Sequence, residues 1–141
     1  MHYVVIDLDT GGIKCANAGM ESPVLIPAGQ RTLMDEECHG IVLGVIPEAT
    51  YEEHSHTVHT GDTLVLFTDG MTEAFDRKDR LLGREGLLER IREYAGAPNA
   101  EAMVQRIFES VLEYSRGSRH RDDMTLLVVK VTATDMGQGT G

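Results

Sequence analysis

Apolar residues in the first half of the chain occur in short runs that are rich in β-branched side chains and separated by glycine, proline and aspartate. Runs of this kind predict β-strands. We predict strands over residues 2–9, 13–19, 22–29, 51–62 and 63–69. The sequence DTGG predicts a hairpin between the first two. Residues 63–69 are the clearest buried strand, and residues 51–62 are polar enough for an exposed or edge strand. Residues 40–47, apolar but interrupted by glycines, are predicted as a strand or a buried loop.

After residue 80 the apolar residues take up helical spacing. This spacing predicts one helix over residues 81–95 and a second over residues 100–115, with Asn99 as the N-cap of the second. We expect the two helices to pack side by side against one face of a sheet. The side chains expected in the core are Leu87, Leu88, Ile91, Ile107, Val111 and Leu112. A last apolar run predicts a buried strand over residues 124–131.

The order of the predicted elements indicates the fold class. Several strands come first, then two helices, then one strand, and such blocks favour an α+β fold over a doubly wound sheet. The 141 residues fit a single domain with a sizeable core. We assign residues 1–132 to this domain and residues 133–141, which are rich in glycine and polar residues, to a flexible tail.

Charge and composition exclude several classes of function. Thirteen basic and 23 acidic residues give a net charge of −10, which argues against nucleic acid and anionic membranes as partners. No apolar run approaches the roughly 20 residues of a membrane span. The N-terminal sequence MHYVVIDLDTGG lacks the features of a signal peptide, and two cysteines make no disulfide framework. We therefore expect a cytoplasmic protein.

Acidic residues stand at the ends of two predicted buried strands. Asp69 follows the run TLVLF, and Asp122 and Asp123 precede the run TLLVVKV. If these strands are antiparallel neighbours, the acids emerge at one edge of the sheet. Like charges at close range repel unless a cation neutralises them, and carboxylate oxygens suit Mg²⁺ or Mn²⁺. Such a site can convert bound water into hydroxide at neutral pH, and Gly70 would let the backbone turn sharply beside the ion.

The same acids have a purely structural interpretation. Acids at strand ends are commonly turn residues or helix caps. Asp123 can fix the turn through its own backbone contacts, and Glu73 can favour the start of a short helix over residues 72–76 through the helix dipole. The pattern of charges alone leaves both interpretations open.

Longer motifs favour the metal site. The sequence GDTLVLFTDGMTEAFD, the helical LLGREGLLERI and the sequence RDDMTLLVVKV together resemble the PPM-type, or protein phosphatase 2C-like, serine/threonine phosphatases. The branch that they resemble most is that of the bacterial sporulation stage II protein E and related sigma-factor regulators. Upstream, IDLDTGGIKCANAG and GIVLGVIPEATYEE resemble a hairpin and a glycine-rich segment of that branch. The resemblance extends to about residue 131.

The resemblance implies a fold, a reaction and a set of site residues. The implied fold is an α+β β-sandwich flanked by helices. The implied metal ligands are Asp69 and Asp122, with Gly70, Glu73 and Asp123 in support. The metals are Mn²⁺ or Mg²⁺, in a two-metal site whose hydroxide attacks phosphorus directly. The implied substrates are phosphoserine or phosphothreonine on a signalling protein such as an anti-sigma-factor antagonist.

The chain departs from the family pattern in two places. Met20 and Glu21 stand where the family has His and Asn in the motif Ala-Gly-His-Asn-Pro-Pro. The earlier family motif Asp-Val-x-Gly-His-Gly, whose Asp bridges both metals, does not occur. We therefore expect the C-terminal part of a phosphatase domain, impaired in hydrolysis by itself and prone to self-association through open strand edges. The alternative is a non-catalytic module that binds a partner in a sigma-regulator pathway.

Three other groups of residues carry weaker signals. His54, His56 and His59 could bind a transition metal but are better explained as part of a solvated strand. Arg116, Arg119 and Arg121 could meet a phosphate but are better explained as solubilising loop residues. Cys38 and His39 do not form a catalytic pair, because adjacent residues on a strand point apart.

Overall fold

The computed structural model describes residues 1–30, 34–35, 39–118 and 122–132. Six strands are followed by three helices and a seventh strand, and this order confirms the predicted α+β class. The strands are β1 (His2–Ile6), β2 (Gly12–Asn17), β3 (Val24–Ile26), β4 (Met34–Asp35), β5 (His54–Thr57), β6 (Thr63–Phe67) and β7 (Leu126–Lys130). The helices are α1 (Asp69–Thr72), α2 (Gly83–Tyr94) and α3 (Ala100–Tyr114). The predicted tail, residues 133–141, lies outside the described residues.

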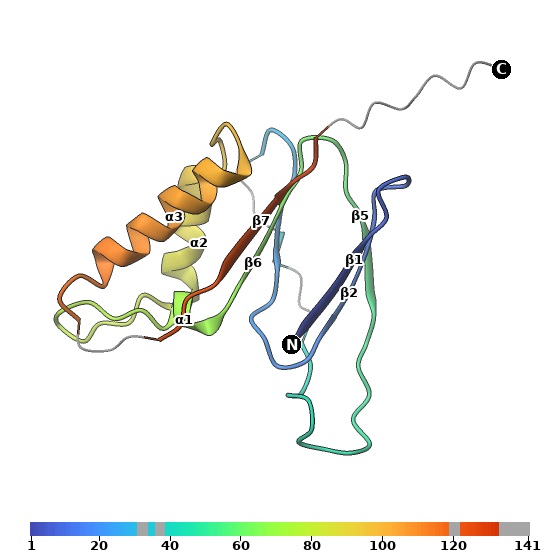
Figure 1. Ribbon diagram of the computed structural model, residues 1–141, viewed down its shortest axis with the longest axis horizontal. Helices are drawn as coiled ribbons and strands as arrows, with labels where there is room; N and C mark the ends of the chain where they lie inside the picture. Colours follow the sequence, from blue (N-terminus) through green and yellow to red (C-terminus); the bar gives the residue numbers. More distant parts are fainter. Residues whose placement is uncertain (31–33, 36–38, 119–121, 133–141) are drawn as a thin grey trace.

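The strands form two sheets. One has the order β1-β2-β5 and the other the order β4-β3-β6-β7, and all neighbouring strands are antiparallel. Figure 1 shows α2 and α3 on one side of the four-stranded sheet and β1, β2 and β5 on the other. The four-stranded sheet is therefore the middle of three layers. This position explains why residues 64–67 of β6 are all apolar rather than alternating with polar ones.

Two apolar clusters hold the layers together. The larger lies between the helices and the four-stranded sheet, and its fully buried members include Val65, Leu87, Ile91, Met103 and Ile107. The smaller lies between the two sheets, with Ile13, Leu25, Val58 and Leu64 at its centre. Successive residues of β6 thus serve opposite clusters, as the pleat of a strand requires.

The predicted helices form and pack together as expected, with one error. Asn99 caps α3, since its side chain accepts a hydrogen bond from the backbone N–H of Ala102 at 2.7 Å. Leu87, Leu88, Ile91, Ile107 and Val111 are buried as predicted. Leu112 is 47% exposed, so its predicted burial is wrong. It lies where the apolar stripe of α3 gives way to the polar face, and it borders an open cavity rather than the sheet.

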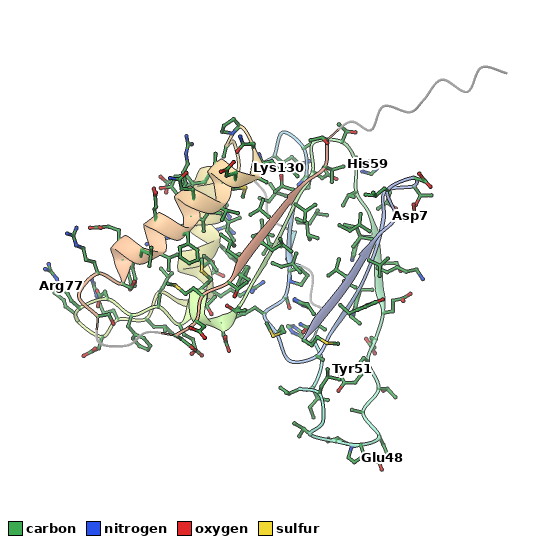
Figure 2. All side chains as sticks on the ribbon, viewed as in Figure 1. Asp7, Glu48, Tyr51, His59, Arg77 and Lys130 are labelled. Atoms are coloured by element: carbon green, nitrogen blue, oxygen red, sulfur yellow. The ribbon has the colours of Figure 1, made fainter. Side chains whose placement is uncertain are left out.

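The segment 40–47 is also not what the sequence predicts. It is a projecting loop without regular structure, and five of its apolar residues are exposed: Ile41, Val42, Leu43, Val45 and Ile46. Figure 2 shows Glu48 at the tip of this loop, with Tyr51 closer to the sheets. Apolar composition shows that a segment can be buried, but it does not show that another part of the fold covers it. None of the helices in the described ranges is long and apolar enough to cross a membrane.

Candidate functional site

The two acidic segments meet at one edge of the four-stranded sheet. Strands β6 and β7 are paired antiparallel so that Phe67, the last residue of β6, lies opposite Leu126, the first residue of β7. The pairing continues beyond the strands, because the backbone N–H of Thr68 donates to the carbonyl of Thr125 at 3.1 Å. The sequence prediction that the residues after β6 and before β7 share an edge is therefore confirmed.

Thr68 fastens the two segments with its side chain as well. Its hydroxyl accepts a hydrogen bond from the backbone N–H of Thr125 at 3.0 Å and donates one to the carbonyl oxygen of Asp123 at 3.3 Å. Both contacts span more than fifty residues of sequence. The segment that carries Asp122 and Asp123 is thus tied to the residue that immediately precedes Asp69.

Gly70 allows these segments to approach closely. It is the second residue of α1, so the sharp turn expected there is absent, and the backbone enters a short helix instead. A Cβ atom at this position would overlap the carbonyl oxygen of Asp123 and lie 2.9 Å from its carbonyl carbon. A glycine is needed here because the segment that contains Asp123 lies so close, and not because of the backbone conformation of Gly70 itself.

Glu73 has a different local role from the one predicted. It is the C-cap of α1, and its backbone N–H donates to the carbonyl of Asp69 at 2.7 Å. The prediction of a short helix over residues 72–76 is therefore wrong. The observed helix begins at Asp69 and ends at Thr72, where the predicted one would start. The acid in the first turn of α1, where the helix dipole favours a negative charge, is Asp69 itself.

The structure divides the predicted site residues between two cavities. Asp122, Asp123, Glu73 and Gly70 border one cavity of about 440 Å³. Asp69 borders another, of about 430 Å³. Both aspartates of the predicted metal site are exposed, and each has one carboxylate oxygen bonded to the next backbone N–H, at 3.0 Å for Asp69 and 2.7 Å for Asp122.

These residues are of the type that binds a divalent cation, but they are too few to complete a metal site. The donors are exposed carboxylate oxygens, which suit a hard cation such as Mg²⁺ or Mn²⁺. Within the described parts of the chain, however, no three His, Cys, Asp or Glu side chains are grouped so as to hold a metal ion. Asp69 and Asp122 therefore provide part of a ligand set, which other donors would have to complete.

A polar network that the sequence pattern does not predict lies beside Asp69. The cavity that Asp69 borders is also lined by Glu21, Ser22, His39 and Arg84. Glu21 and Arg84 form an ion pair at 2.7 Å, and both side chains are about three-quarters buried, with relative exposures of 24% and 25%. The one sign of this network in the sequence is the departure from the family pattern at Glu21. The sequence does not identify the partners of Glu21, because Thr72 and Arg84 lie 51 and 63 residues away.

Two other acids prove to be structural. The carboxylate of Asp62 accepts backbone hydrogen bonds from Ala28 at 2.7 Å and His59 at 2.8 Å, and so fixes the turn before β6. Asp76 is buried and bonds to the backbone N–H and the guanidinium of Arg80. The backbone bond from Arg80, together with that side chain, holds the pKa of Asp76 below its ordinary value.

The weaker candidates do not form sites in the described structure. His59 is exposed beyond β5, as the solvated-strand interpretation expects, but that interpretation is wrong for His54 and His56, which lie half-buried on one face of the strand. Arg116 pairs with Glu113 at 3.4 Å on the surface. Arg119, Arg121 and Cys38 lie outside the described residues.

Comparison with known proteins places this geometry in a family. The family model for stage II sporulation protein E (SpoIIE) matches residues 1–132. Over 130 residues the chain is 32% identical to the phosphoserine phosphatase RsbU of Bacillus subtilis. That match covers 92% of this chain and 38% of RsbU, so the chain spans well under half the length of this relative.

Solved structures show the same fold. The structure of the RsbU and RsbW domains of Rv1364c from Mycobacterium tuberculosis aligns with a TM-score of 0.77 at 22% identity, over 94% of this chain and 36% of that one. The SiaA-PP2C domain of Pseudomonas aeruginosa aligns with a TM-score of 0.73 at 21% identity, over 92% of this chain and 50% of that one. The protein phosphatase 2C-like fold that the motifs imply is confirmed, and this chain corresponds to part of it.

Proposed function

The chain belongs to the stage II sporulation protein E family, and from this membership we propose that it is part of a metal-dependent protein phosphatase. The reaction proposed is hydrolysis of phosphoserine or phosphothreonine on a bacterial signalling protein in the cytoplasm, such as an anti-sigma-factor antagonist. The name of its relative RsbU, a phosphoserine phosphatase, supports this substrate class.

One observation carries the proposal. The segments that bear Asp69 and Asp122 lie side by side at one sheet edge, held by the backbone pairing of β6 with β7 and by the Thr68 hydroxyl. The sheet that carries this edge is packed on both faces, and precise metal ligation requires a well-supported scaffold. Two carboxylates at such an edge would repel each other without a cation between or beside them.

The residues of this chain have defined roles in the proposed reaction. Asp69 would offer its exposed oxygens to Mn²⁺ or Mg²⁺ from one cavity, and Asp122, with Glu73 and Asp123 in support, would offer its own from the other. A bound divalent metal supplies a hydroxide at neutral pH and neutralises charge on the phosphoryl group. Gly70 keeps the two segments in contact, and Thr68 fixes their register.

The test of the metal role is a binding measurement. Isothermal titration calorimetry with Mn²⁺ should give weak binding by the parent chain and a further loss for Asp69→Asn and for Asp122→Asn. Asp9→Asn is the matched control, because Asp9 is exposed in the β1–β2 turn and loses the same charge. Unchanged Mn²⁺ affinity in Asp69→Asn would remove Asp69 from the site and contradict the proposal.

Hydrolysis by this chain alone should be slow or absent. Two acids cannot by themselves fix two metals at the separation of roughly 3.5–4 Å that a two-metal hydrolase uses. The experiment compares this chain with a version extended upstream, in Mn²⁺, on a phosphoserine protein. Comparable turnover by the two versions would refute the idea that further residues complete the site.

The incomplete ligand set in the described residues also favours a second candidate function. A domain of this shape could bind a sigma-regulator partner without hydrolysing its phosphoester. Stable capture of the phosphorylated partner by the extended version, with no release of phosphate in Mn²⁺, would support this binding role over the enzyme.

Self-association is part of the proposal as well. Strand β1 is paired only with β2 among the described elements, so it is an open edge. Tyr3 and Val5 of β1 are 62% and 44% exposed, and Leu8, just after the strand, is 77% exposed. Open edges with apolar side chains favour pairing with another chain. Sedimentation velocity across a range of concentrations should therefore detect dimers or larger species, and Val5→Lys should reduce them.

A further inference from the structure

A partly buried carboxylate joins three separate parts of the chain beside Asp69. Glu21 lies in the connection between β2 and β3, and each of its oxygens has its own partner. The hydroxyl of Thr72, on α1, donates to Oε1 at 2.9 Å. The guanidinium of Arg84, on α2, donates to Oε2 at 2.7 Å. Through these two bonds one side chain connects both helices to the inner strands.

The contacts around this carboxylate hold it in a fixed place. The other arm of the Arg84 guanidinium donates to the carbonyl of Ser22 at 3.0 Å, and its Cζ atom lies over the ring of Phe67, 5.3 Å from the ring centre. On the other side, buried Asn17 closes the loop before Glu21 by exchanging two hydrogen bonds of 2.8 Å with the backbone of Met20. Neither Glu21 nor Arg84 is free to rotate without breaking several of these bonds.

The helix that this network holds is the one that begins with Asp69. Four residues are too few for a helix to be stable by itself, and the Thr68 side chain gives α1 no N-terminal cap bond. Its position therefore depends on tertiary contacts, which are the burial of Met71, the approach of Gly70 to Asp123 and the bond from Thr72 to Glu21. The Thr72 hydroxyl also lies 3.0 Å from the carbonyl oxygen of Asp69.

We propose that Glu21 is a positioning residue for Asp69, acting through Thr72 and α1, with Arg84 as the cation that holds the Glu21 carboxylate in place. The inference rests on the proposed metal role of Asp69. It assigns a function to a position where the chain departs from the family motif. The family has Asn there, and an Asn side chain could not offer two anionic oxygens to Thr72 and Arg84 at once. Glu21 touches neither metal nor substrate in this role.

The test uses variants that break the network at different bonds. Glu21→Gln keeps the shape but removes the charge, and its amide can satisfy only one of the two donors. Thr72→Val removes the hydroxyl that reaches Glu21, and Thr72→Ser restores it. Glu53→Gln is the matched control, because Glu53 also forms a 2.8 Å ion pair, with Lys14, but does so on the exposed face of the three-stranded sheet.

Two readouts are taken on the full chain. Mn²⁺ affinity is measured by calorimetry, and hydrogen exchange is measured at the Glu73 amide, whose bond to the carbonyl of Asp69 closes α1. We expect Glu21→Gln and Thr72→Val each to weaken Mn²⁺ binding by roughly 10-fold, a typical loss when the support of a ligand is removed. Exchange at Glu73 should be faster in both, whereas Thr72→Ser and Glu53→Gln should match the parent.

The double variant identifies the pathway. If Glu21 acts through Thr72, then Glu21→Gln combined with Thr72→Val should bind Mn²⁺ no more weakly than either single variant. Loss of binding in Glu21→Gln with normal binding in Thr72→Val would overturn the inference, because Glu21 would then be acting directly. Parent-like affinity in Glu21→Gln, with binding lost in Asp69→Asn, would overturn this inference alone. Parent-like affinity in Asp69→Asn, or a parent that binds no Mn²⁺, would refute the proposed metal role and this inference with it.

Discussion

Replacing Gly70 by alanine is the sharpest single perturbation of the acidic edge. The new methyl group would overlap the carbonyl oxygen of Asp123 and lie 2.9 Å from its carbonyl carbon and 3.4 Å from the N of Met124. These are backbone atoms, which cannot swing aside as a side chain can. The segment before β7 must therefore move away from α1, and the segments that carry Asp69 and Asp122 must separate.

Two opposing effects set the size of the change in stability. Steric overpacking of this kind costs about 1–3 kcal/mol. Alanine in place of glycine inside a helix stabilises the helix by about 1 kcal/mol, and the gain is smaller in a helix of four residues. The net loss in the free energy of unfolding should be about 0.5–2 kcal/mol. The bonds that Thr68 makes to Asp123 and Thr125 resist the separation, so the loss should lie toward the upper end of that range.

The assay pairs urea unfolding with a Mn²⁺ titration, and Gly96→Ala is the control. Gly96 follows α2 and has no atom within 4 Å of the position that a Cβ would take, so the same methyl group meets no neighbour there. We expect Gly70→Ala to lose both stability and Mn²⁺ affinity, and Gly96→Ala to keep both. If the two variants unfold at the same urea concentration and bind Mn²⁺ equally, the close approach of Gly70 to Asp123 does not hold the edge together.

Two further predictions test the core and a structural acid. Ile107→Ala should cost about 2–5 kcal/mol in urea unfolding because Ile107 is fully buried, whereas Leu112→Ala, at a 47% exposed position, should cost far less; equal losses would contradict the assignment of the helix faces. Asp76→Asn should destabilise the chain at neutral pH, since the folded state holds the pKa of Asp76 below the unfolded value of 3.8 through the backbone and guanidinium of Arg80. That stabilisation is complete above pH 3.8 and is lost as the pH falls through the folded pKa. The difference in the free energy of unfolding between variant and parent should therefore shrink in acid. A difference that does not depend on pH would mean that ionisation of Asp76 is not its source.

Local patterns in the sequence were sufficient for the fold class and for the two long helices. The change from strand to helical spacing near residue 80 located α2 and α3, and Asn99 marked the start of α3. Acids at the inner ends of two apolar runs predicted a shared edge, because antiparallel neighbours bring the end of one strand beside the start of the next. These inferences succeed because period, caps and strand direction are properties of short stretches of chain.

The tertiary structure decided whether apolar residues at the edges of the core are buried. Leu112 belongs to the apolar stripe of α3 by spacing, yet it borders a cavity and is 47% exposed. Residues 41–46 are apolar enough for a buried segment, yet they project from the sheets. A hydrophobic pattern records which residues favour burial but carries no information on where a covering surface ends.

The detailed arrangement of the site was also beyond the sequence. Gly70 was expected to make a turn but instead makes room for Asp123, and Glu21 finds Thr72 and Arg84 across 51 and 63 residues of chain. Contacts of this kind depend on how the sheets stack and on the angle at which helices cross them, and these are set by the packing of the whole core. Sequence by itself thus determined which residues could hold a charge at the edge, and only the folded chain determined which of them meet, because spatial proximity between distant residues is created by packing rather than by spacing.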